Sequence, residues 1–177
     1  MRRKKLILLA TLLAIVIGGC GKISDERISI SGYKGLEVDR KAEDFESDVW
    51  KALLENCTVE EYPADELNSL IEKLEQQYSY VAYYEGKTAS ELIEERHGMT
   101  TEELAKEQLK KEYAIRLIAE TEDLNLSSEE YEEKLAEEAE SNGMKDSKEY
   151  ESMFGQEELK KMFLEERVLN FLIENLK

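Results

Sequence analysis

The sequence predicts an all-α fold, elongated and built from several helices. Composition gives the first indication: 41% of the 177 residues are hydrophobic and 37% are charged, while nine glycines and one proline leave few residues that interrupt helices. Apolar residues also recur at helical spacing from residue 42 onward. The third indication is a Ser or Thr followed three residues later by Glu at the points where this apolar pattern restarts, which is typical of helix starts.

Residues 1–19 have the organisation of an export signal. Basic residues at positions 2–5 precede the almost wholly apolar run 6–17, which is shorter than the ~20 residues of a membrane-spanning helix. Residues 17–20 (IGGC) resemble the lipobox of bacterial lipoproteins, in which small residues precede a lipid-modified cysteine. We therefore expect cleavage after residue 19 and a lipid on Cys20, which would anchor the protein to the extracytoplasmic face of the cell membrane, in a Gram-positive bacterium. An ordinary signal peptide with a chance cysteine is the alternative.

Residues 20–41 are interpreted as the lipidated cysteine and a linker, and residues 42–177 as one helical domain. The segment 21–31 is polar and mixed, which suits a tether. Residues 32–38 predict a short extended piece with Tyr33, Leu36 and Val38 as apolar anchors and glycines as hinges.

The first helices are expected at 42–56 and 63–85, the second with Pro63 in its first position, where proline sacrifices no hydrogen bond. Thr88 with Glu91 predicts a short helix that ends at Gly98, and Thr100 with Glu103 predicts the start of the next. This next helix is apolar almost all round at 113–119, so we expect it at the centre of the fold.

A further helix should start at Ser127, where Glu130 completes a capping box, and end at residues 142–143. Asp146 with Glu149 predicts a short segment up to Gly155. The last helix is expected at 156–176, with its apolar end 168–173 buried beside 114–119.

The sequence argues against several classes of function. A formal charge of −17 disfavours nucleic acid as a partner. The single histidine, His97, precedes Gly98 in a helix's last turn and suits a structural role. Cys57 is expected to be a buried small hydrophobe, with a reactive or intermolecular thiol as the alternative. Residues 86–88 (GKT) mimic a P-loop, but Val81 stands where its first glycine would be. We expect no metal, no cofactor and no catalytic constellation.

Aromatic and sulfur-containing side chains are unusually frequent near the predicted helix ends. Flexible Met and amphipathic Tyr favour adaptable binding surfaces, but they also fill gaps between loosely packed helices, and both interpretations stay open. The candidate contacts for a bound protein are Tyr78, Tyr80, Tyr83, Tyr84, Met99, Met144, Met153 and Phe154.

The order of these segments resembles the C-terminal chaperone domain of trigger factor, which is related in fold to the chaperone part of SurA. Residues 32–38 are similar to the segment that leads into the body of trigger factor, and residues 56–66, with Val59 and Pro63, to the entry to its first arm. Residues 103–131 are similar to the central helix and its turn into the next arm, and residues 157–176 to the closing helix. The resemblance spans residues 32–177.

The resemblance implies an elongated helical body with arms that bind non-native proteins. The roughly twenty residues between leader and body leave no room for the ribosome-docking and prolyl isomerase domains of trigger factor, so we expect neither ribosome binding nor enzymatic activity. The sequence thus predicts a lipid-anchored, ATP-independent holdase for newly exported proteins, which assists their folding and transport. The alternative is an adaptor lipoprotein that docks one fixed envelope partner. Neither interpretation predicts an oligomeric state.

Overall fold

The computed structural model describes residues 22–177, which form seven helices and one three-stranded sheet. The mostly helical architecture confirms the predicted all-α class. The predicted leader 1–19 and Cys20 lie outside the described residues.

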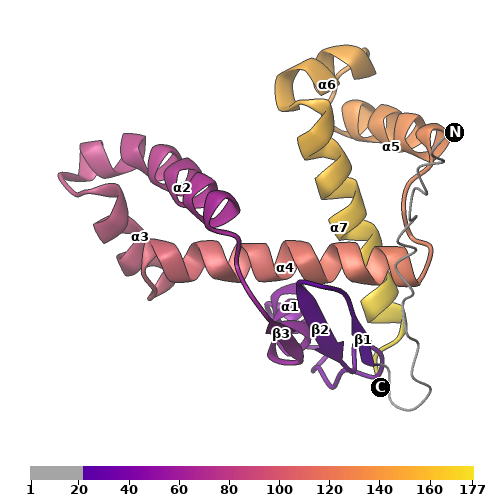
Figure 1. Ribbon diagram of the computed structural model, residues 1–177. Helices are drawn as coiled ribbons and strands as arrows, with labels where there is room; N and C mark the ends of the chain where they lie inside the picture. The colour runs from indigo at the N-terminus through magenta and orange to yellow at the C-terminus, as the bar shows by residue number, and fades with distance from the viewer. Residues whose placement is uncertain (1–21) are drawn as a thin grey trace, which may run out of the picture.

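The helix α4, Thr101–Thr121, forms the spine of an elongated molecule (Figure 1). One arm, α2 and α3, extends from its beginning, and a second arm, formed by α5, α6 and the first half of α7, rises near its end. The sheet and α1 lie on the other side of α4 from the second arm. The remaining helices are α1 (Phe45–Glu55), α2 (Ala64–Glu85), α3 (Ala89–His97), α5 (Ser128–Ser141), α6 (Ser147–Phe154) and α7 (Gln156–Glu174).

Residues 22–31, which the sequence predicts to be a tether, are folded into two strands. Antiparallel strands β1 (Lys22–Ser24), β2 (Ile28–Ser31) and β3 (Cys57–Val59) form a sheet in that order. Ile28 and Ile30 are fully buried, and Ile30 pairs with Cys57 across the sheet. The body of the protein therefore includes residues from position 22 onward, because these strands bury apolar side chains that a tether would expose to water.

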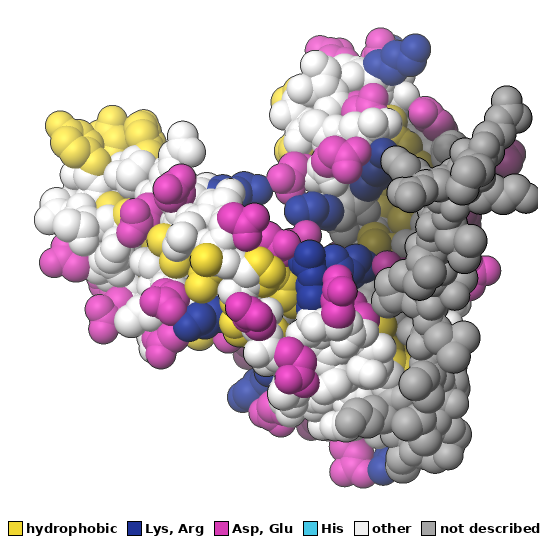
Figure 2. All heavy atoms as spheres, viewed as in Figure 1, with side chains coloured by type: hydrophobic (Ala, Val, Ile, Leu, Met, Phe, Trp, Pro, Cys, Tyr) yellow, Lys and Arg dark blue, Asp and Glu magenta, His cyan; other side chains and the backbone are white. Residues whose placement is uncertain are grey.

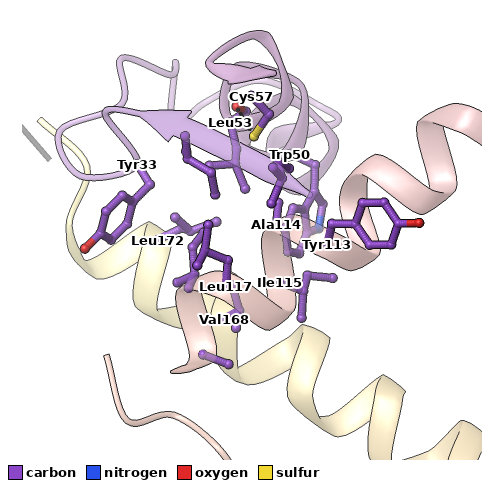
Figure 3. Packing of buried hydrophobic residues seen from close by; sticks show 14 of the residues in the cluster. Tyr33, Trp50, Leu53, Cys57, Tyr113, Ala114, Ile115, Leu117, Val168 and Leu172 are labelled. Carbon is purple, nitrogen blue, oxygen red and sulfur yellow. Dashed lines mark hydrogen bonds between the residues drawn. The ribbon is translucent and has the colours of Figure 1, made fainter. Parts of the chain in front are cut away.

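The largest core joins segments from the whole length of the chain (Figure 3). Ala114 and Leu117 of α4 lie beside Val168 and Leu172 of α7, as predicted, and Tyr33 packs against the same cluster. Each arm has a smaller core of its own. The core of the first arm joins Leu74 and Ile93 to Leu104 and Ala105 at the start of α4. The second contains Tyr131, Leu135, Ala139, Tyr150, Leu159 and Phe163.

The helix starts agree closely with the local sequence signals. In all three predicted capping boxes the first residue accepts a hydrogen bond from the backbone of the Glu, whose carboxylate accepts one in return. For Thr88 and Glu91 the two distances are 3.2 Å and 2.8 Å. Asp146 instead accepts from the backbone N–H of Lys148, at 2.9 Å. Pro63 precedes the first residue of α2 and does not occupy it.

Gly86 and Gly98 end α2 and α3, as predicted. Both adopt left-handed backbone angles, with φ of 68° and 69°, which glycine tolerates without strain. The turn at Gly86 reverses the chain so that α2 and α3 pack against each other, and the turn at Gly98 leads from α3 into α4.

Candidate functional site

An open hollow of about 670 Å³ lies where the two arms meet the spine. We call it the central hollow. Leu70 and Lys73 of α2 border it on one side, Met162 of α7 on the other, and Ile115 and Arg116 of α4 form its floor. Figure 2 shows the surface recessed between the arms, with Lys and Arg side chains gathered in the recess. The hollow therefore offers an apolar surface beside positive charge.

Ion pairs cross the central hollow from one element to another. Lys73 Nζ lies 2.9 Å from a carboxylate oxygen of Glu158, and among residues 22–177 this is the one ion pair that joins α2 to α7. Lys161 pairs with Glu112 at 3.1 Å and so joins α7 to α4. Because all four side chains are more than half exposed, each pair contributes at most about 1 kcal/mol to stability. The arms are thus held together only weakly across the hollow.

The outer end of α2 carries an exposed group of tyrosines, which we call the tyrosine patch: Tyr80, Tyr83 and Tyr84. Their exposed fractions are 70%, 79% and 70%. The rings of Tyr80 and Tyr84 meet edge to face with centroids 4.9 Å apart, and those of Tyr83 and Tyr84 at 5.6 Å. Figure 2 shows this patch at the tip of the first arm. Contiguous aromatic surface of this kind is typical of sites that bind other proteins.

The second arm also has an apolar tip. Met153 and Phe154, at the end of α6, are both more than half exposed, and the Phe154 ring packs against buried Tyr150 with centroids 4.7 Å apart. Met162 is exposed as well, within the central hollow. The sequence places Met162 with Leu159 and Phe163 on the apolar face of an amphipathic helix, which does not mark it as a contact residue.

Three of the predicted contact residues pack between helices instead. The hydroxyl of Tyr78 is 2.5 Å from Nε2 of His97, so this pair joins α2 to α3. Met99 packs against the core of the first arm and Met144 against that of the second. The two interpretations left open by the sequence therefore divide the set: Tyr80, Tyr83, Tyr84, Met153 and Phe154 are exposed, while Tyr78, Met99 and Met144 are half-buried.

Two of the groups with a shifted pKa, Cys57 and Tyr113, belong to the main core. Burial raises the pKa of the Cys57 thiol to about 11, and the thiol donates to the carbonyl of Leu53 at 3.3 Å. Cys57 is thus a buried hydrophobe, as predicted, and stays protonated at neutral pH. Burial and a 2.7 Å hydrogen bond to Glu66 raise the pKa of Tyr113 to about 12.

Two kinds of structure are absent from residues 22–177. These residues contain no group of His, Cys, Asp and Glu side chains arranged to hold a metal ion. Within the same residues, every helix is too short or too polar to cross a membrane.

The chain matches a known protein family over most of its length. Residues 37–174 match the family described as the C-terminus of bacterial trigger factor protein, whereas no curated protein matches the chain. The matched range covers both arms, the spine and the closing helix, which agrees with the resemblance inferred from the sequence. It supports a chaperone-type function with unfolded proteins as clients. The chain belongs to the trigger factor C-terminal domain family.

Proposed function

We propose that the protein is a membrane-anchored, extracytoplasmic holdase that binds exposed hydrophobic segments of newly exported proteins without using ATP. The observation that carries this proposal is the pair of apolar arm tips on either side of an open hollow. The family match points to clients that are not yet folded. The leader and residues 17–20 support the membrane location, with Cys20 as the lipid carrier.

The arrangement explains how clients can be held and released without an energy source. A client that covers one exposed tyrosine gains roughly 25 cal/mol for each Å² of apolar surface removed from water. Separate patches on two arms let a client bind through several weak contacts, whose combined strength exceeds each one. Any single contact breaks easily, so a client segment that buries its own apolar side chains by folding can leave.

Enzymatic activity is not part of the proposal. The family match covers the arm-bearing domain, and the described residues contain no group of side chains arranged to hold a metal ion. We expect the protein not to accelerate prolyl isomerisation of a test peptide. Measurable acceleration would contradict this part of the proposal.

The test follows light scattering when a chemically unfolded, unrelated protein is diluted into the full chain held in lipid nanodiscs, with empty nanodiscs as the blank. We expect near-stoichiometric chain to suppress scattering at both low and moderate salt, because apolar contacts are insensitive to screening. Suppression that disappears at moderate salt would assign the effect to the acidic surface.

Unchanged scattering at excess chain would remove the holdase proposal and favour an adaptor with one fixed partner. A pull-down then separates the two functions. A holdase recovers a broad set of proteins in substoichiometric amounts, whereas an adaptor recovers one protein at a fixed ratio.

A further inference from the structure

The central hollow continues into a second recess of about 490 Å³ on the side of the sheet. Five residues line both spaces: Leu70, Lys73, Glu112, Arg116 and Lys161. Three of them are cations and one is a carboxylate, in a chain whose formal charge is −17. The junction of the two spaces therefore gathers three cations on an acidic protein, and each of them is paired with one carboxylate, from Glu158, Glu112 or Asp25. Figure 2 shows dark blue Lys and Arg side chains between the arms.

Arg116 has the loosest ion pair of these cations, although its side chain is the least exposed of the three. Its nearest carboxylate is that of Asp25, which lies 3.5 Å from Nη2, and the guanidinium also lies 5.5 Å from the centroid of the Tyr113 ring. A guanidinium has five N–H donors in a planar fork that fits a carboxylate, so one loose contact leaves most of them open. The side chain is 41% exposed, which gives a ligand access to it.

Lys73 and Lys161 can exchange their present partners. Their ion pairs with Glu158 and Glu112 are more than half exposed, so water competes with both. An incoming carboxylate can replace Glu158 beside Lys73, and that exchange also releases the ion pair between α2 and α7.

Apolar side chains border the same space. Leu70, Ile115, Met162 and Leu164 line the central hollow, and Met162 is exposed there. Met adapts its shape to different apolar partners. A ligand with an apolar side chain next to a carboxylate would therefore find both kinds of surface at one place.

We propose that the central hollow binds a carboxylate of the client that lies beside a bulky apolar side chain. Arg116, Lys73 and Lys161 hold the carboxylate, and Leu70, Ile115 and Met162 receive the apolar side chain. The inference rests on the proposed function and adds a chemical preference to it. This preference is opposite to the one that the net charge favours, since an acidic surface attracts basic segments.

The test measures fluorescence anisotropy of dye-labelled peptides with the full chain in nanodiscs of zwitterionic lipid, at low salt. One peptide has a Leu-Phe pair followed by Glu and an amidated end. The second has Gln in place of Glu. The third has Gln and a free terminal carboxylate after the Leu-Phe pair.

We expect the Glu peptide to bind roughly five- to tenfold more tightly than the amidated Gln peptide. Tighter binding of the third peptide would instead identify the chain end as the preferred source of the carboxylate.

Arg116→Gln should abolish this preference and leave binding of the amidated Gln peptide unchanged. Arg96→Gln is the matched control, because Arg96 is similarly exposed, makes one ion pair and lies on α3 away from the hollow. Arg116→Lys should retain only part of the preference, since an ammonium lacks the planar fork. Circular dichroism checks the fold, and Lys161→Gln replaces Arg116→Gln if the latter unfolds.

Equal binding of all three peptides would overturn the inference and leave the holdase proposal standing. A preference that survives both Arg116→Gln and Lys161→Gln would overturn it as well. Failure to bind any peptide, together with unsuppressed scattering, would remove the inference and the proposed function together.

Discussion

The two arms are attached to the body in different ways. In the second arm, α7 runs without a break from the arm into the main core, where Val168 and Leu172 are fully buried. The first arm has no helix that runs into the main core. It touches that core at the base of α2, through the half-buried Leu67 and Leu70, and its smaller core is shared with Leu104 and Ala105 at the start of α4. The first arm also has the larger aromatic patch. We expect its tip to adapt to different partners more readily than that of the second arm, in which one continuous helix joins the arm to the main core.

The largest expected effect distinguishes the two attachments. Leu172→Ala should lower the free energy of unfolding of the whole protein by about 2–5 kcal/mol, because it opens a cavity in the main core. Leu74→Ala removes an equally buried leucine from the first arm, and we expect its effect to appear as faster amide exchange confined to 64–105. Thermal unfolding together with hydrogen exchange checks both. Uniform exchange in the two variants would show that the arms are not energetically distinct.

The second prediction compares the two tips. Replacing Tyr80, Tyr83 and Tyr84 together by Ser should raise several-fold the amount of protein needed to suppress scattering, since it removes the larger apolar surface. Met153→Ser with Phe154→Ser should have a smaller effect. Thermal unfolding should show little change in the tyrosine variant, because these side chains are exposed. Equal losses at the two tips would contradict the assignment of the main contact to the first arm.

The third prediction concerns the base of the first arm. Glu66 accepts hydrogen bonds from the Arg27 guanidinium at 2.8 Å and from the Tyr113 hydroxyl at 2.7 Å, and so ties α2 to the sheet and the spine. Glu66→Gln should cost about 1 kcal/mol in the free energy of unfolding, measured by denaturant titration, because a charge-assisted bond is lost in a half-exposed place. Glu72→Gln, an exposed change on the same helix, is the control. A larger loss for Glu72→Gln would disprove the role of Glu66.

The smallest expected effect concerns an ion pair of the second arm, between Glu130 and Arg167, and the response of stability to acid. Hydrogen bonds from Arg167 and from the backbone of Ser127 lower the pKa of Glu130 to about 2. Folding lowers the pKa of Glu130, so the ionised carboxylate stabilises the folded protein at pH values above about 4.3, the pKa of an unfolded glutamate. This stabilisation is lost as the pH falls toward 2. Glu130→Gln should therefore reduce the fall in melting temperature between pH 5 and pH 2. Glu129→Gln, its exposed neighbour, should not.

The sequence predicted the helices well because their signals are local. Each capping box lies within four residues, and the apolar pattern of α4 showed directly that the helix is central. The sequence does not predict the sheet, although Ile28 and Ile30 alternate with serines, because β2 pairs with Cys57–Val59, which lies far along the chain. For that reason residues 22–31 read as a tether in the sequence alone.

The candidate site was predicted only where one helix contains it. Tyr80, Tyr83 and Tyr84 crowd one helix end, so their directions follow from the sequence, and their exposure agrees with it. The central hollow was not predicted, since its walls come from α2, α4 and α7 and require the arms to be placed in space. For the same reason Arg116 had no distinguishing signal in the sequence.

Folded structure begins very close to the proposed lipid anchor, and this limits where the protein would meet its clients. Because β1 begins at Lys22, only Gly21 separates the folded body from the lipid proposed on Cys20. One residue spans roughly 3.5 Å, so a body anchored in this way cannot swing far from the bilayer surface. Its encounters would then depend on lateral diffusion in the membrane plane, and chains emerging close to that plane would be captured before those released into the bulk.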